Sequence, residues 1–251
     1  MGVDEMSPVQ DLSIKLFSDG ADIEEMKKIY RAGLVKGFTT NPSLMRKAGV
    51  TDYEAFAREV LQEIPDLPIS FEVFSDEFET MEKEARRISS WGKNVSAKIP
   101  ITNTRKQSSV PLIKKLCAEG ISLNVTALLT VPQVEAVARV LLPETKAIVS
   151  VFAGRIADTG RDPVPLMKEA AQILASRPHA ELLWASSREV FNIFQAQACG
   201  CHIITVTHDI LKKLSLLGKN LEDLSLDTVK MFHEDARFAG YRFSDGEPPA
   251  P

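Results

Sequence analysis

Cysteine is scarce in this sequence, and its few cysteines form no recognisable pattern. The chain has three, Cys117, Cys199 and Cys201, which is an odd number without zinc-type spacing to histidine. Disulfide frameworks usually need an even set of cysteines in an extracellular protein. We therefore expect reduced thiols, a cytoplasmic location and no metal site.

Long hydrophobic runs and long basic runs are lacking as well. No stretch approaches the about 18 uninterrupted apolar residues of a membrane span, and no apolar segment follows a basic start at the N-terminus. The sequence therefore predicts neither membrane insertion nor secretion. A formal net charge of -4 without a basic run disfavours nucleic acid as the main partner, although a few arginines can still bind a small anion.

What the sequence does contain is an alternation of short β-rich runs and helical patterns, repeated eight times. This rhythm is typical of βα units around a parallel sheet. Strands are expected at 13–18, 33–40, 68–74, 93–100, 121–126, 147–152, 182–185 and 202–206. Helices are expected at 22–32, 51–64, 76–90, between 109 and 120, and at 132–142, 163–176, 188–198 and 208–217, with a turn at 41–43 and loops at 102–109 and 154–162.

Eight such units predict an α/β fold, a closed (β/α)8 TIM barrel over about residues 13–217. A further helix is expected at about 222–243, and its apolar face needs a surface to cover: Leu226, Val229, Phe232 and Ala236. That helix either closes the mouth of the barrel or docks on a neighbouring subunit. We expect the whole chain, 1–251, to form a single domain with a flexible tail at 244–251.

The most informative strand is KNVSAKIP at 93–100. Its apolar residues alternate with Ser96 and Lys98, so Lys98 faces away from the apolar side near the end of the strand. A lysine in that position either reaches solvent at the rim or is held in a desolvated pocket, where it can attack carbonyl groups.

Polar residues recur at the C-terminal ends of the neighbouring strands with the same inward facing. Because the active site of a (β/α)8 barrel lies at this end, they should converge on one volume. Each alone is more simply a helix cap or a satisfied core hydroxyl, but the whole set favours a site. The polar set comprises Asp19, Thr39, Asn41, Ser70, Glu72, Lys98, Asn124, Thr126, Ser150, Ser186 and Arg188, and the apolar Phe152 shares the facing of Ser150.

Seven motifs in a fixed order resemble the transaldolase family, in particular its shorter branch, which includes the fructose-6-phosphate aldolases. The resemblance covers roughly residues 14 to 217. The motifs are LFSDGAD at 16–22, GFTTNPSLM at 37–45, SFEVF at 70–74, AKIPITNT at 97–104, LNVTALLT at 123–130, SVFAGRIADTGRD at 150–162 and ASSR at 185–188.

This resemblance implies class I chemistry on a (β/α)8 barrel without a metal or organic cofactor. Lys98 would form a Schiff base with a ketose phosphate donor, and a dihydroxyacetone unit would pass to an aldose phosphate acceptor. Asp19 would take the proton of the C4 hydroxyl, while Glu72 and Thr126 would hold a water for proton transfer. The three-carbon unit would be bound by Asn41, Asn124, Ser150 and Phe152, and the phosphate by Arg155, Ser186 and Arg188.

Two departures from the family pattern bear on specificity. Phe152 stands where the aldolase branch carries a tyrosine, which favours transfer over release of free dihydroxyacetone. The chain is also shorter than the classical transaldolases and longer at its C-terminal end than the smallest members. We expect a homo-oligomer, with sedoheptulose 7-phosphate or fructose 6-phosphate as the default donor and a pentose or tetrose phosphate as acceptor.

Three alternatives stay open. The acceptor could be a specialised sugar of a biosynthetic pathway, the enzyme could be an aldolase that releases free dihydroxyacetone, or the barrel could bind sugar phosphates without catalysis. The joint presence of Lys98, Asp19 and Glu72 argues against a non-catalytic barrel, because a binding module needs no imine-forming amine.

Overall fold

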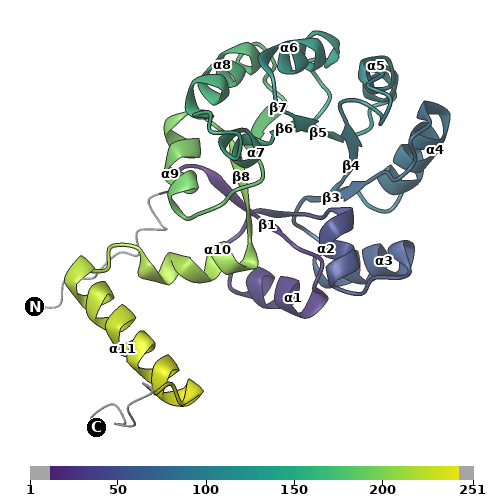
Figure 1. Cartoon of the computed structure of the whole chain (residues 1–251). Coiled ribbons are helices and arrows are strands. Elements are labelled where there is room, and N and C mark those ends of the chain that lie inside the picture. Colours follow the sequence, from purple (N-terminus) through teal and green to yellow (C-terminus); the bar gives the residue numbers. More distant parts are fainter. Residues whose placement is uncertain (1–11, 243–251) are drawn as a thin grey trace, which may run out of the picture. The chain divides into compact units, whose positions relative to one another are not determined.

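Eight parallel strands close into a barrel in the computed structural model, which describes residues 12–242. Each strand pairs with the next, and β1 pairs with β8 to close the ring, as predicted (Figure 1). The strands are β1 (Lys15–Asp19), β2 (Gly37–Thr39), β3 (Ile69–Glu72), β4 (Val95–Pro100), β5 (Leu123–Leu128), β6 (Ala147–Val151), β7 (Ala180–Trp184) and β8 (Ile203–Thr207).

Helices surround this ring of strands (Figure 1). They are α1 (Ile23–Arg31), α2 (Pro42–Lys47), α3 (Tyr53–Glu63), α4 (Phe78–Ser89), α5 (Val110–Ala118), α6 (Val131–Val140), α7 (Ala153–Ala157), α8 (Val164–Leu174), α9 (Phe191–Ala198) and α10 (His208–Lys212), followed by the 3-10 turn η1 (Lys213–Leu216).

Two short helices correct the sequence-based prediction of a turn at 41–43 and a loop at 154–162. Helix α2 forms because the Asn41 side chain accepts the backbone N–H of Leu44 and Pro42 occupies the first helical position. Helix α7 contains Arg155, so this side chain projects from a helical turn directly after β6. Both helices lie at the C-terminal ends of strands and therefore shape the mouth of the barrel.

Side-chain caps fix the start of two outer helices, and of these only the Asp22 cap was predicted from the sequence. Asp22 accepts the backbone N–H of Glu25 at the start of α1. Thr130 and Gln133 form a reciprocal capping box at the start of α6, where Pro132 lies in the first turn. These local bonds set where each helix leaves the strand end before it.

The barrel interior changes from apolar to polar along its axis. Its apolar part includes Phe17, Ile148, Leu183, Ala185 and Ile203, which pack together, with Phe152 against them. The alternation predicted for β4 is confirmed, since the buried side chains of Val95, Ala97 and Ile99 share one face of the strand. The polar residues of the strand ends lie beyond the apolar cluster, toward the mouth.

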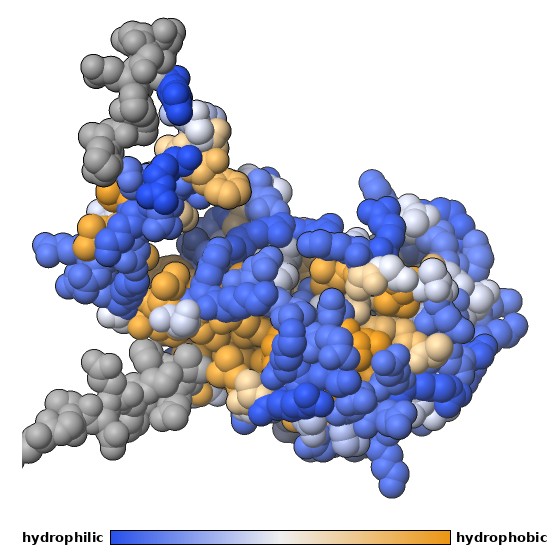
Figure 2. Space-filling view, turned by 90° about the horizontal axis from the view of Figure 1, so that it is seen from below, coloured by the Kyte–Doolittle hydropathy of each residue, from blue (hydrophilic) through white to orange (hydrophobic). Residues whose placement is uncertain are grey.

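The outer surface of the molecule is mixed in character. Hydrophilic residues cover much of the face seen in Figure 2, and hydrophobic residues also show on it, most broadly left of centre. Among residues 12–242, no helix is both long enough and apolar enough to cross a membrane.

The chain divides into two compact units, one of residues 11–213 with the barrel and one that contains residues 214–242. In the second unit, α11 (Leu221–Ala239) starts at Asn220, whose side chain accepts two backbone N–H groups. The predicted end at residue 243 is wrong, because Gly240 adopts a left-handed conformation with a φ of 68° that stops the helix. The predicted flexible tail at 244–251 lies outside the described residues, and a single domain stays a prediction.

Candidate active site

A cavity of about 410 Å³ opens at the C-terminal mouth of the barrel. Ten of the eleven site residues predicted from the sequence line it, and Asn124 is the exception: Asp19, Asn41, Glu72, Lys98, Thr126, Ser150, Phe152, Arg155, Ser186 and Arg188. Residues from β1 to β8 or the turns after them therefore meet in one volume, as the strand parity predicted.

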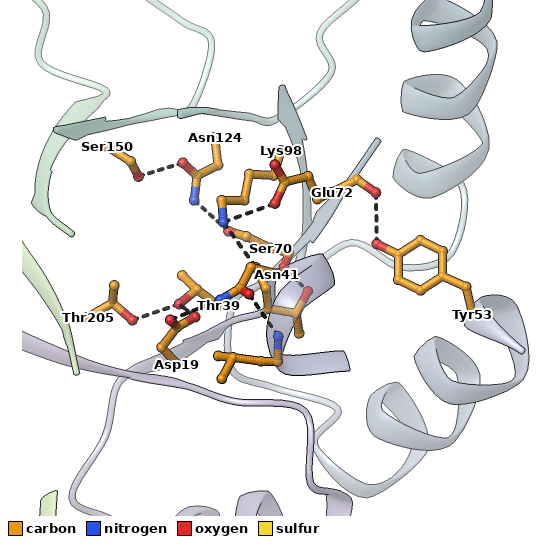
Figure 3. A network of polar contacts seen from close by, with 12 residues as sticks. Asp19, Thr39, Asn41, Tyr53, Ser70, Glu72, Lys98, Asn124, Ser150 and Thr205 are labelled. Carbon is orange, nitrogen blue, oxygen red and sulfur yellow. Dashed lines mark hydrogen bonds and ion pairs between the residues drawn. The ribbon is translucent and has the colours of Figure 1, made fainter. Parts of the chain in front are cut away.

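Lys98 is a buried amine in this cavity, with 6% of its surface exposed. Its Nζ donates to the backbone carbonyl of Thr40 at 3.0 Å and lies 3.3 Å from Oε2 of Glu72 (Figure 3). Register explains the ion pair, because Glu72 and Lys98 are direct partners in the β3–β4 ladder and face the same side. The sequence left two positions open for Lys98, a solvent-exposed rim and a buried pocket. The structure places Lys98 in the pocket.

Asp19 is the last residue of β1 and lines the same cavity. Its two oxygens accept from Thr39 Oγ1 at 2.8 Å and from Asn41 Nδ2 at 3.2 Å. Although the carboxylate keeps some solvent contact, burial within the barrel raises the pKa of Asp19, opposed by the positive charge of Lys98 and by these hydrogen bonds. Asp19 consequently holds a proton more tightly than an exposed aspartate.

A second threonine supports Asp19 from β8. Thr39 Oγ1 and Thr205 Oγ1 are 2.7 Å apart. Because Thr39 has one hydroxyl proton and donates it to Asp19, Thr205 must donate to Thr39. Sequence reasoning missed Thr205, although its inward parity in the eighth strand was a usable signal.

Asn41 holds two elements together. Its Nδ2 donates to Asp19, while its Oδ1 accepts the backbone N–H of Leu44 and caps α2. The orientation of the Asn41 amide is therefore fixed by partners on both of its polar atoms.

Asn124 is fully buried and does not line the cavity. It belongs to a hydrogen-bonded series of side chains from β6, β5 and β3. Ser150 Oγ donates to Asn124 Oδ1 at 2.7 Å, and Asn124 Nδ2 donates to Ser70 Oγ at 3.0 Å (Figure 3). The hydroxyl of Thr126 is also buried, and it makes no hydrogen bond within residues 12–242. Ser150 and Thr126 thus differ, since Ser150 already donates its proton to protein and Thr126 does not.

The turn after β7 packs unusually closely against α7. A Cβ on Gly154 would lie 1.5 Å from the backbone oxygen of Ser186, so only glycine fits there. Ser186 itself has a left-handed φ of 62°, which a serine rarely adopts. This contact places Arg155 of α7 and the Ser186 turn on the same side of the cavity.

The two predicted phosphate-binding arginines have different surroundings. The Arg155 guanidinium lies 5.3 Å from the centre of the Phe152 ring, a cation–π geometry. Arg188 instead forms a two-point ion pair with Asp158, Nε donating to Oδ1 at 3.1 Å and Nη2 donating to Oδ2. No sequence pattern indicates that Asp158 would pair with this arginine.

Comparison with known proteins agrees with the geometry. Residues 16–242 match the model of the family described as Transaldolase/Fructose-6-phosphate aldolase. A protein of Thermoanaerobacter sp. (strain X514) named "Probable transaldolase" is 34% identical over 230 residues, which are 91% of this chain and 100% of the relative. "Probable transaldolase 2" of Listeria monocytogenes is 35% identical over 218 residues, 85% of this chain and 95% of the relative.

A third relative, "Probable transaldolase" of Caldicellulosiruptor saccharolyticus, is 37% identical over 204 residues, covering 80% of this chain and 89% of the relative. The match to the family model extends over the barrel and includes every cavity residue named above. The chain belongs to the transaldolase/fructose-6-phosphate aldolase family of enzymes.

Proposed function

We propose that this enzyme is a transaldolase that transfers a dihydroxyacetone unit from a ketose phosphate to an aldose phosphate through a Schiff base on Lys98. The observation that carries the proposal is the buried amine of Lys98, 3.3 Å from Glu72, in a cavity that also contains Asp19 and two arginines. An amine so enclosed can attack a carbonyl that the cavity presents to it.

Imine formation is the first chemical step. Lys98 Nζ attacks the C2 carbonyl of the donor to give a carbinolamine, which loses its hydroxyl as water and leaves an iminium ion. Both stages move protons, and Glu72 is the carboxylate nearest to the amine. We assign to Glu72 and Thr126 together a water that carries these protons. The buried Thr126 hydroxyl makes no hydrogen bond within residues 12–242 and would turn toward that water.

Cleavage of the C3–C4 bond is the second step, and we assign the base to Asp19. Its carboxylate takes the C4 hydroxyl proton while the bonding electrons pass into the iminium ion, and the aldose phosphate leaves. The raised pKa of Asp19 suits this role, because a base with higher proton affinity accepts the proton more readily. In the reverse sense, Asp19 returns the proton to the new hydroxyl when the acceptor aldehyde is attacked.

Binding of the substrate fits the remaining residues. Asn41 and Ser150 face the cavity and would hold hydroxyls of the three-carbon unit, with Asn124 behind Ser150. Arg155, Ser186 and Arg188 gather on the side of α7 and the turn after β7, where phosphate would bind. A guanidinium fork matches phosphate oxygens in geometry and charge.

The default donors are sedoheptulose 7-phosphate and fructose 6-phosphate, as in pentose phosphate metabolism, with an aldose phosphate as acceptor. A homo-oligomer and a cytoplasmic location belong to the same proposal. The apolar residues Leu226, Val229 and Phe232 of α11 support an oligomer, because an apolar helix face needs a surface to cover it.

Phe152 favours transfer over free aldol cleavage. Its ring lines the cavity and offers no hydrogen bond to a water near Glu72 and Thr126, whereas a tyrosine hydroxyl there could supply one. Stronger activation of that water would hydrolyse the imine before an acceptor arrives. Phe152→Tyr should therefore raise the release of free dihydroxyacetone relative to transfer.

The test is to incubate the protein with each ketose phosphate, with and without aldose phosphate acceptors, and to identify the products by mass. A transaldolase turns over the donor slowly alone and much faster with an acceptor. Equal rates with and without acceptor, accompanied by free dihydroxyacetone, would make the enzyme an aldolase. No product from any pair would leave a barrel that only binds sugar phosphates.

A further inference from the structure

The backbone carbonyl of Glu72 lacks the sheet partner that its position would normally give it. In the β2–β3 ladder, the N–H of Phe38 donates to the oxygen of Pro68 at 2.9 Å, and the N–H of Thr40 donates to the oxygen of Ser70 at 3.2 Å. The next donor in this series would be residue 42, opposite the carbonyl of Glu72. Residue 42 is proline, which has no N–H, and the chain has already left β2 there because Pro42 begins α2.

Tyr53, the first residue of α3, replaces that missing donor. Its hydroxyl donates to the Glu72 carbonyl oxygen at 3.0 Å (Figure 3). The hydroxyl keeps its proton across the working pH range, because burial raises the pKa of Tyr53 far above its ordinary value. The backbone at the end of β3 is thus held by a side chain from outside the barrel.

The tyrosine ring is itself held firmly in place. Its centre lies 4.5 Å from that of Phe74, 5.5 Å from that of Trp91 and 6.2 Å from that of Phe71. Phe71 and Phe74 lie on either side of Glu72 in the sequence, so the ring packs against the same strand end that its hydroxyl binds. A rigid donor of this kind restricts the backbone dihedrals of Glu72.

We propose that Tyr53 is a positioning residue for Glu72 in the imine-forming half of the reaction. Glu72 is the last residue of β3, and its side chain must reach across to Lys98 on β4. The direction of that side chain is set by the Glu72 backbone, which the Tyr53 hydroxyl restrains. The inference rests on the proposed function, because it assigns Tyr53 to the proton transfers that Glu72 serves.

The direct test is Tyr53→Phe, which removes one hydroxyl and keeps the ring and its packing. Borohydride trapping with unphosphorylated dihydroxyacetone should show imine formation slowed by roughly three- to tenfold, the size expected for one lost neutral hydrogen bond. C–C bond cleavage from a preformed imine should stay at the wild-type rate. Tyr30→Phe is the matched control, because the Tyr30 hydroxyl binds Asp66 before β3, at the other end of the barrel.

A double-mutant cycle separates positioning from general support of the fold. In a Glu72→Gln background, Tyr53→Phe should slow trapping by less than about twofold, because the group it positions has lost its charge. A full and independent effect in that background would overturn the proposal, and so would a wild-type trapping rate in Tyr53→Phe alone. If the wild-type protein itself traps no imine, the proposed Schiff-base function is wrong. If the wild-type protein traps the imine and Tyr53→Phe traps it equally fast, only the positioning role of Tyr53 is wrong.

Discussion

Asp158 should compete with the substrate phosphate for Arg188. Two N–H groups of Arg188, those of Nε and Nη2, already donate to the Asp158 carboxylate, and they form the fork that a phosphate would use. Their hydrogen bonds lower the pKa of Asp158, so the competing carboxylate stays ionised at neutral pH. Phosphate must therefore displace Asp158 before Arg188 can bind it with both groups.

The size of this competition follows from the exposure of the pair. The two side chains are 52% and 51% exposed, and solvent screens such an ion pair until it contributes little. Asp158→Asn leaves an uncharged and weaker acceptor in the same shape. We expect the KM for a phosphorylated donor to fall by about two- to fivefold, with kcat unchanged.

Steady-state kinetics with fructose 6-phosphate and an aldose phosphate acceptor measures the effect. Trapping of unphosphorylated dihydroxyacetone should not change, and the gain should shrink as salt is added. Asp66→Asn removes the same charge at the opposite end of the barrel and should leave KM at its wild-type value. A rise of KM in Asp158→Asn would refute the reasoning, because it would mean that Asp158 orients Arg188 for phosphate.

Two further predictions concern stability. Gly154→Ala places a methyl 1.5 Å from the Ser186 oxygen, and such overpacking costs about 1–3 kcal/mol of stability. The Tm should therefore fall, and the KM for phosphorylated donors should rise because the Arg155 side of the cavity is displaced. Wild-type values of both Tm and KM would contradict the close contact. Burial raises the folded-state pKa of Asp19 above its unfolded value of about 3.9, so ionisation of Asp19 costs stability as pH rises. The Tm of Asp19→Asn relative to wild type should therefore increase from about pH 4 to about pH 7, and a difference independent of pH would count against the raised pKa.

The barrel and most of the cavity could be predicted from the sequence because both depend on local patterns. Alternation within β4 fixed the facing of Lys98, and the βα rhythm placed strand ends together. Caps such as Asp22 are also local, since donor and acceptor lie three residues apart. The boundaries of elements depend less on local patterns, and the sequence predicts a turn and a loop where the short helices α2 and α7 form.

Partners that meet only in three dimensions could not be predicted. The distance in sequence between Thr39 and Thr205 is 166 residues, and no periodicity in either strand specifies their contact. The pairing of Arg188 with Asp158 depends on how closely α7 approaches the turn after β7, which Gly154 permits. Likewise, β5 continues to Leu128 through a register shift at Ala127, whose φ of 61° no sequence pattern indicated.

The central claim is that Lys98 carries the substrate, and covalent trapping tests it most directly. Wild-type protein is incubated with fructose 6-phosphate, reduced with borohydride and digested, and the modified peptide is located by mass spectrometry. The account predicts a reduced three-carbon unit on the peptide that contains Lys98, and no label in Lys98→Ala. Turnover of the donor with the label on another lysine, or with no label on any lysine, would contradict it.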